Sequence, residues 1–127
     1  MALLELKNLK TFFATKRGTV KAVNGVSYSL DAGKVLGVVG ESGSGKSVSA
    51  MSILRLLDGN GYIDSGEILF NGVDLTKLSM NEMYKIRGNE ISVIFQEPMT
   101  SLNPVFTVSR QISEPLMIHQ GMTKKQA

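Results

Sequence analysis

The fold is decided by one stretch, Gly40-Glu41-Ser42-Gly43-Ser44-Gly45-Lys46-Ser47, which fits the pattern G-x-x-x-x-G-K-[ST] without a mismatch. In a chain of 127 residues, a chance match is expected on the order of once in a few hundred sequences. The glycines let successive backbone N–H groups turn inward around a phosphate, and a helix beginning near Lys46 directs its positive dipole end to the same place. Lys46 adds a full charge toward the β- and γ-phosphates, and the Ser47 hydroxyl is a ligand for Mg²⁺. The stretch therefore predicts a P-loop that binds a nucleoside triphosphate with Mg²⁺.

The segments on either side of this loop support the interpretation. Residues 35–39 are apolar without alternation, which is typical of a parallel strand buried on both faces. After the loop, four apolar residues lie at the i, i+3, i+4, i+7 spacing of a helix: Ala50, Ile53, Leu54 and Leu57. Asp58-Gly59-Asn60-Gly61 is expected to end that helix. This order of strand, loop and helix favours a P-loop over an ordinary glycine-rich turn with a solvated lysine.

Antiparallel strands are predicted before and after the P-loop region. Residues 3–7 and 20–30 alternate between apolar and polar, and the polar turn at residues 15–19 lets them pair as a hairpin. Glu67 to Phe70 reads as a further short strand, and Asn71-Gly72 is a strong tight-turn signal behind it.

The next segment predicts a short helix followed by a buried strand. Ser79-Met80-Asn81-Glu82 forms a capping box, because the Ser79 hydroxyl and the Glu82 carboxylate can each accept from an unpaired amide. Gly88 is well placed to end the helix. Ile91 to Phe95 is then a dense apolar stretch, for which we expect another buried strand.

The last part of the sequence predicts helix starts. Thr107 can cap a helix from Val108, which Pro115 is expected to kink or interrupt. Residues 123–126 look like the cap and first turn of a further helix, yet no apolar face follows before Ala127. Two parallel-type strands with one helix between them also leave a core sheet half built. We therefore expect these residues to be part of a longer protein.

Composition narrows the classes of function. The formal net charge is +3 and 20% of the residues are charged, a balance that suits an anionic ligand but does not indicate nucleic acid. No cysteine is present, which excludes disulfides, cysteine zinc sites and a cysteine nucleophile within these residues. No apolar run approaches the roughly 18 residues that a spanning helix needs. A P-loop alone does not choose between ATP and GTP, but the guanine-reading Asn-Lys-x-Asp of GTPases is absent from these residues.

Three features taken together resemble the ATP-binding subunit of an ABC transporter: the P-loop, the turn at Asn71-Gly72, and the sequence Ile-Ser-Val-Ile-Phe-Gln-Glu-Pro at residues 91–98. The continuation at residues 99–104, Met-Thr-Ser-Leu-Asn-Pro, is similar to the dipeptide, oligopeptide and nickel importer branch. The resemblance implies an α/β fold of the P-loop NTPase class: the N-terminal part of an ABC nucleotide-binding domain, with an antiparallel β-subdomain and an incomplete parallel core sheet. On this basis residues 1–104 belong to the ATP-binding domain and residues 105–127 begin its helical subdomain.

The resemblance also assigns roles to single residues. Gln96 corresponds to the Q-loop glutamine, which reaches Mg²⁺ and the attacking water; the alternative is a polar residue at the end of a strand. Phe13 corresponds to the aromatic that stacks on adenine, although Phe12 could take that role because a strand places the two rings on opposite faces. Lys46 and Gln96 are thus the expected catalytic residues, and Ser47 and Gln96 the metal ligands. The full predicted ATP-binding set is Phe13, Gly40, Glu41, Ser42, Gly43, Ser44, Gly45, Lys46, Ser47 and Val48.

A Walker B reading of the stretch ending in Glu97 is rejected, because glutamine at position 96 cannot supply the charge of the metal-associated aspartate. The ABC signature, the Walker B Asp-Glu pair and the switch histidine are all absent from these residues. Since phosphoryl transfer relies on several such groups together, we expect these 127 residues to turn over ATP negligibly by themselves.

In the full-length protein the resemblance implies an ATPase that energises import of di- or oligopeptides at the cytoplasmic face of the membrane. Its implied partners are a second ABC ATPase subunit, two transmembrane permease subunits and, indirectly, an extracytoplasmic solute-binding protein, with no nucleic acid. Three alternatives stay open: nickel as the transported solute, a soluble ABC-type ATPase acting on nucleic acid or a ribosome, and a non-catalytic nucleotide-binding fragment.

Overall fold

The computed structural model describes residues 2–127. The chain divides into two compact units, Met1–Leu78 and Ser79–Ala127, and each is described by itself. Within residues 2–127, no helix combines the length and the apolar character needed to cross a membrane.

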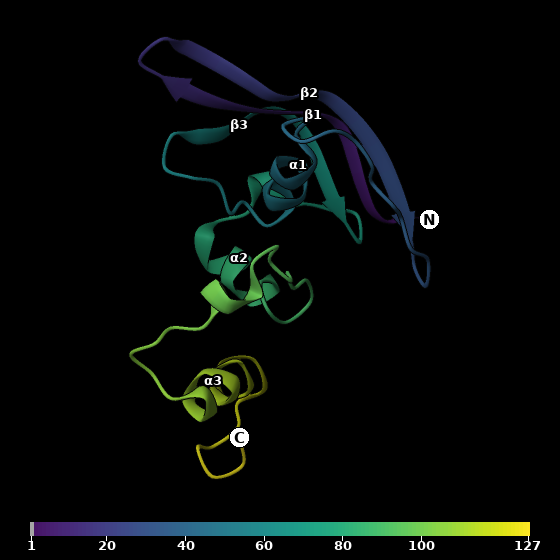
Figure 1. Cartoon of the computed structure of the whole chain (residues 1–127). Helices are drawn as coiled ribbons and strands as arrows, with labels where there is room; N and C mark the ends of the chain where they lie inside the picture. Colours follow the sequence, from purple (N-terminus) through teal and green to yellow (C-terminus); the bar gives the residue numbers. More distant parts are fainter. Residues whose placement is uncertain (1) are drawn as a thin grey trace. The chain divides into compact units, whose positions relative to one another are not determined.

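The first unit is built on a four-stranded antiparallel sheet (Figure 1). Its strands are β1 (Ala2–Thr15), β2 (Gly18–Asp31), β3 (Gly61–Phe70) and β4 (Val73–Asp74), in the spatial order β2-β1-β3-β4. β1 is central: it forms the predicted hairpin with β2 and pairs on its other side with β3. The predicted antiparallel pair is therefore confirmed, with both strands longer than the alternating stretches indicated.

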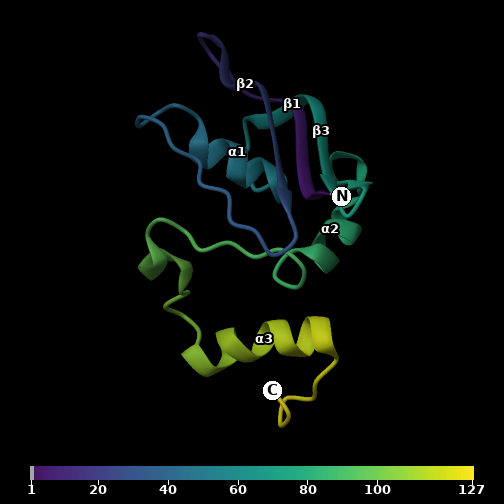
Figure 2. The ribbon, with the colours of Figure 1, turned by 90° about the vertical axis from the view of Figure 1, so that its right-hand side faces the viewer.

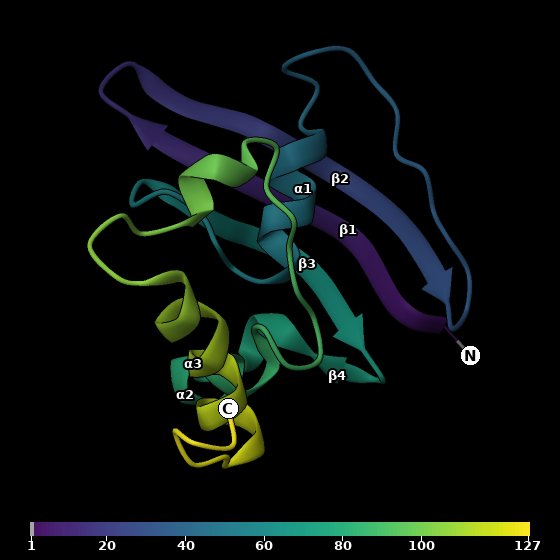
Figure 3. The same cartoon turned by 60° about the horizontal axis from the view of Figure 1, so that its bottom comes forward.

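Helix α1 (Lys46–Ile53) lies against this sheet, as Figures 1 and 3 both show. The core beneath it is small and mainly aliphatic, because the inward-facing residues of the strands meet the end of α1 and the segment after β4. The buried apolar residues of the first unit are Leu6, Leu9, Phe12, Val23, Leu54, Ile68 and Leu75. Burying each aliphatic side chain contributes roughly 1.5–3 kcal/mol, so this core holds the helix on the sheet.

The turn between β3 and β4 is the predicted tight turn. Asn71 has a φ of 49° and Gly72 a φ of 81°, the left-handed pair that a two-residue hairpin needs, and Phe70 pairs with Val73 across it. Asn and Gly are the residues that adopt this conformation at least cost, which is why the pair was a reliable signal.

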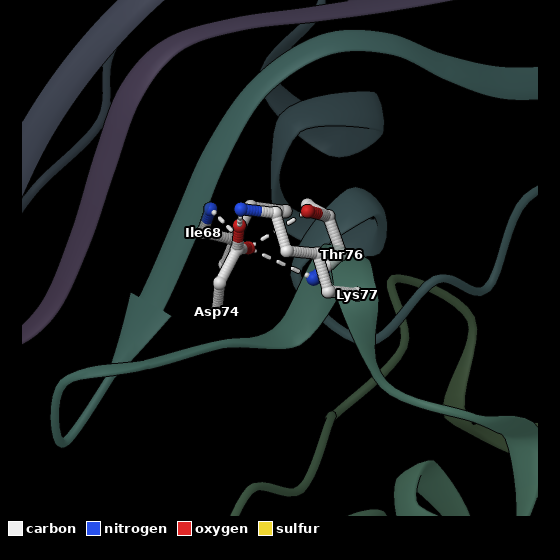
Figure 4. A network of polar contacts seen from close by, with 4 residues as sticks. All are labelled: Ile68, Asp74, Thr76 and Lys77. Atoms are coloured by element: carbon white, nitrogen blue, oxygen red, sulfur yellow. Dashed lines mark hydrogen bonds and ion pairs between the residues drawn. The ribbon is translucent and has the colours of Figure 1, made fainter.

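A polar network around Asp74 fastens the end of this hairpin (Figure 4). Asp74 Oδ1 accepts from the backbone N–H of Ile68 (3.3 Å), and from the backbone N–H (3.0 Å) and hydroxyl (2.7 Å) of Thr76, at the start of the 3₁₀ helix η1 (Leu75–Lys77). Its Oδ2 lies 3.6 Å from the Lys77 ammonium. Burial raises the pKa of this carboxyl, but the three hydrogen bonds and the lysine together outweigh it and hold the pKa below its ordinary value of 3.8.

The predicted strand at residues 35–39 is wrong. The segment belongs to no strand, and Val35 and Val39 are 98% and 93% exposed. A strand buried on both faces needs hydrogen-bonded neighbours, and among the described residues no strand pairs with it.

The helix after the P-loop is shorter than predicted and buries a different face. It ends at Ile53, and Arg55, with a φ of 55°, turns the chain out of the helix before residues 58–61 are reached. Ser49 and Ser52 are its buried residues, while Ala50 is exposed. The apolar spacing predicted the wrong buried face because Leu54, although buried, follows the last helical residue and is not part of a helical stripe.

The second unit contains α2 (Met80–Ile86), the 3₁₀ helix η2 (Pro98–Ser101) and α3 (Val108–Gln120). The predicted capping box is present: the Ser79 N–H donates to Glu82 Oε2 (2.7 Å), and the Glu82 N–H donates to Ser79 Oγ (3.3 Å). Gly88 follows the helix end with a φ of 74°. The predicted strand at residues 91–95 is wrong, because only Ile91 forms a bridge, to Arg87, and Ile94 is 95% exposed.

Helix α3 begins at the predicted cap, where Thr107 Oγ1 accepts from the Arg110 N–H (3.3 Å). Pro115 lies inside the helix but does not interrupt it, and Figure 2 shows one continuous helix. The expected cap at residues 123–126 is also present, since the Thr123 N–H donates to Gln126 Oε1 (2.9 Å) and the Gln126 N–H to Thr123 Oγ1 (3.3 Å).

All strand pairs of the sheet within residues 2–127 are antiparallel. The predicted antiparallel strands are therefore present, and the two strands predicted for a parallel core sheet are not. The division of the chain at residue 104 concerns the subdomains of the family, and it stays a prediction beside the two packing units.

We predict that Asp74→Asn lowers the free energy of unfolding by about 1 kcal/mol near neutral pH, because hydrogen bonds to a charged acceptor become bonds to a neutral one. In the wild type this contribution is present above the ordinary carboxyl pKa and is lost as the pH falls through the depressed native pKa, since the unfolded carboxyl takes up its proton first. Urea unfolding across the acid range measures both effects. The exposed Asp64→Asn is the control, and a pH-independent difference for Asp74→Asn would contradict the assignment.

Candidate functional site: the phosphate-binding loop

The predicted P-loop closes on its own lysine. Lys46 Nζ donates to the carbonyl oxygens of Gly40 (2.6 Å) and Glu41 (2.8 Å) and lies 3.4 Å from Ser44 Oγ. Figure 3 shows the chain arching from the end of β2 back to α1, and the P-loop is the last part of this arch. The ammonium group therefore lies within the curve of the loop.

A side chain at Gly45 would collide with backbone, whereas one at Gly40 would come closest to the Ser44 hydroxyl. A Cβ on Gly45 would overlap the carbonyl oxygen of Ala22 in β2, and its φ is 94°. A Cβ on Gly40 would lie 2.6 Å from Ser44 Oγ. Gly43, with a φ of 81°, faces open space, so it is needed for its left-handed backbone alone. The glycines thus serve different purposes: one lets the loop touch the sheet, one lets it fold on itself and one turns it.

The start of α1 presents unpaired donors beside this charge. Gly45 is the N-cap in a left-handed conformation, without a side-chain cap in the part of the chain described. The first intrahelical bond runs from the Ser49 N–H to the Gly45 carbonyl (2.9 Å), so the amides of Lys46, Ser47 and Val48 precede it. Such amides and the helix dipole favour an anion at this end.

A cavity of about 290 Å³ adjoins the loop, lined on one side by β2, from Lys21 to Tyr28, and on the other by Ser44, Gly45 and Lys46. A larger cavity of about 720 Å³ lies in the second unit along α3, and no predicted site residue lines it. Of these two cavities, only the smaller one is lined by residues of the phosphate loop.

Two buried serines behind the loop were not among the predicted residues. Ser49 Oγ donates to the Lys46 carbonyl (2.8 Å), and Ser52 Oγ donates to the Val48 carbonyl (2.7 Å). Ser52 Oγ also lies 2.8 Å from Thr11 Oγ1 of β1, and both residues are fully buried. The available signal was their i, i+3 spacing, which an analysis of apolar residues passes over.

The two candidate aromatics differ in their surroundings. Phe12 is buried, its ring meets Tyr62 edge-on at 6.2 Å between centroids, and the Lys21 ammonium lies 5.7 Å from its centre. Phe13 is partly exposed, and its ring lies over Gly61 of β3. Neither ring lines the cavity beside the loop. Of the two rings, that of Phe13 is therefore the more exposed.

Gln96 and Glu97 belong to the second unit and are both exposed. Gln96 lies at a bend ahead of η2, and the Glu97 carbonyl accepts from the Thr100 N–H and hydroxyl. The structure therefore gives Glu97 a part in a local turn, and the role of Gln96 at a metal stays a prediction.

The chemistry of the loop fits Mg²⁺ held together with phosphate. Among the described residues, no cluster of three or more His, Cys, Asp or Glu side chains could hold a metal ion alone. Ser47 is exposed at the start of α1, where its hydroxyl can add one ligand to those that a nucleotide supplies.

Comparison with known proteins agrees with this geometry. The ABC transporter family model matches residues 23–127, and the chain belongs to this family. The oligopeptide transport ATP-binding protein AppD of Bacillus subtilis (strain 168) is 50% identical over 98% of this chain and 38% of its own length. The oligopeptide transport ATP-binding protein OppD of Escherichia coli (strain K12) is 49% identical over 99% of this chain and 37% of its own. The chain thus spans about two fifths of the length of these relatives.

The same fold is found among solved structures. The dimeric structure of MJ0796, a bacterial ABC transporter cassette, matches with a TM-score of 0.78 and 26% identity, covering 91% of this chain and 47% of that one. The predicted P-loop NTPase fold of the ABC type is therefore confirmed.

We predict that Gly45→Ala destabilises the protein more than Gly43→Ala, even without nucleotide. Both substitutions force a left-handed backbone on alanine, which costs roughly 1–2 kcal/mol, but only the one at Gly45 also drives a methyl group into the Ala22 carbonyl. Thermal unfolding without ligand measures the difference. Equal losses for the two variants would mean that the loop does not press on β2.

Proposed function

We propose that the first unit binds Mg·ATP at the loop formed by residues 40–48. The observation that supports this most directly is the Lys46 ammonium inside the curve of the loop, next to the unpaired amides at the start of α1. Lys46 supplies the charge for the β- and γ-phosphates, the amides supply donors, and the Ser47 hydroxyl is the protein ligand for Mg²⁺. When bound, the metal neutralises charge on the phosphates and orients them.

Phe13 is proposed as the ring that stacks on adenine. Phe12 is less suited, because it is buried between Tyr62 and the Lys21 side chain, and freeing it would uncover part of the core. Phe13 keeps an exposed portion, and stacking of a base on such a ring contributes roughly 1–3 kcal/mol.

We predict that Lys46→Ala weakens Mg·ATP binding at least tenfold, since a hydrogen bond to a charged group contributes roughly 1.5–3 kcal/mol. Lys34→Ala is the matched control, because it removes the same charge from an exposed position before the loop. Isothermal titration calorimetry on the full-length protein measures both. Unchanged affinity for Lys46→Ala would contradict the whole assignment.

In the full-length protein we propose that this site hydrolyses ATP to energise import of di- or oligopeptides. This proposal is supported by relatives that are named oligopeptide transport ATP-binding proteins and are about 50% identical to this chain over nearly its whole length. Gln96 is proposed to reach the metal and the attacking water. The proposed partners are a second ATPase subunit, two transmembrane permease subunits and a solute-binding protein, which places the subunit at the cytoplasmic face of the membrane. The nickel and nucleic-acid alternatives are not favoured by these relatives.

We predict that the full-length protein, reconstituted with its membrane subunits and solute-binding protein in lipid vesicles, hydrolyses ATP faster when a peptide is supplied. The matched arms are nickel ions and a polynucleotide, neither of which is expected to stimulate hydrolysis. Phosphate release measures the rate, and the Lys46→Ala protein provides the background. Stimulation by nickel or polynucleotide in place of peptide would contradict the proposal.

A further inference from the structure

A relay of two hydrogen bonds joins strand β1 to the first turn of α1. Ser52 Oγ donates its single proton to the Val48 carbonyl (2.7 Å), so the 2.8 Å contact between Ser52 Oγ and Thr11 Oγ1 is donated by Thr11. Both hydroxyls are fully buried. The direction of the relay is therefore fixed: Thr11 donates to Ser52, and Ser52 donates to Val48.

The two ends of the relay lie next to the two halves of the proposed nucleotide site. Thr11 directly precedes the two phenylalanines on β1, and Phe13 is two residues away on the same face of the strand. Val48 lies in the first turn of α1, within the proposed phosphate-binding set. The relay thus connects the strand that carries the adenine-side ring to the turn that carries the phosphate donors.

A hydroxyl pair at this place costs desolvation that an apolar pair would avoid, and in return it sets distance and direction more narrowly than apolar packing does. The other buried residue of α1, Ser49, donates to the Lys46 carbonyl of its own helix, and Val23, which pairs with Thr11 across the strands, is buried and apolar. Slippage of the helix along the strand is resisted most specifically at Thr11 and Ser52.

We propose that Thr11 and Ser52 are positioning residues for ATP, which hold the phosphate-binding turn at a fixed distance from the aromatic ring on β1. This inference rests on the proposed function of the loop. Neither side chain touches the nucleotide. Because ATP spans both halves of the site, its binding depends on their spacing, whereas an inorganic phosphate chain contacts only the loop.

The test compares Mg·ATP with magnesium tripolyphosphate by calorimetry on the full-length protein. Thr11→Val keeps the shape of the side chain and removes its proton, while Ser52 still donates to Val48. We expect about a fivefold loss of affinity for ATP and a change of less than roughly twofold for tripolyphosphate. Thr11→Ser restores the hydroxyl and is expected to retain the wild-type affinity for both.

A second variant separates positioning from stability. In Thr11→Val with Ser52→Ala both buried hydroxyls are gone, so no unpaired group remains and the unfolding temperature is expected near that of the wild type. If this double variant binds ATP as the wild type does, or loses ATP and tripolyphosphate equally, the proposal is overturned. The double variant also provides the test of the proposal if Thr11→Val alone fails to fold.

Failure of the proposed function gives a different result from failure of this inference. A wild-type protein that binds neither ATP nor tripolyphosphate contradicts the phosphate site itself. A wild-type protein that binds both, with variants that do not discriminate between them, contradicts the positioning role alone.

Discussion

The close approach of Gly45 to the Ala22 carbonyl is the constraint on which the phosphate loop depends. At this point the chain must turn from the arch after β2 into α1 while touching the sheet, and no side chain fits between them. The helix then begins at Lys46, whose ammonium group turns back to the Gly40 carbonyl of the loop. A loop of this kind binds an anion through backbone geometry, so its shape has to be held by the framework behind it.

That framework is small, and polar contacts supplement its apolar core. Buried leucines from β1 and the end of α1 supply the packing, while Thr11 and Ser52 add a directed contact inside it. At the far edge, Asp74 fastens the β3–β4 hairpin and η1 through hydrogen bonds that keep its carboxylate charged. Apolar burial sets how firmly the helix is held, and the polar contacts set where it is held.

What the sequence could predict followed the range of the interaction involved. The capping boxes at Ser79 and at residues 123–126, the cap at Thr107 and the turn at Asn71-Gly72 depend on neighbours within a few residues, and all are present. The needs of Gly40 and Gly43 are local in the same sense, whereas Gly45 is required by its contact with Ala22 of β2. The contact of Ser52 with Thr11 joins residues 41 positions apart, and no periodic pattern announces a pair of hydroxyls. The strands expected at residues 35–39 and 91–95 needed partners that an apolar run cannot specify.

The distinction between local and long-range contacts also applies to nucleotide binding and ATP hydrolysis. The loop, the first turn of α1 and the two strands behind it all lie within the first unit, so the parts of the proposed phosphate site are supplied by one compact piece of chain. Gln96 belongs to the second unit, and phosphoryl transfer needs positioned groups in addition to a charged cradle. A binding site formed by one compact unit can be controlled separately from a set of catalytic groups that come from different parts of the chain.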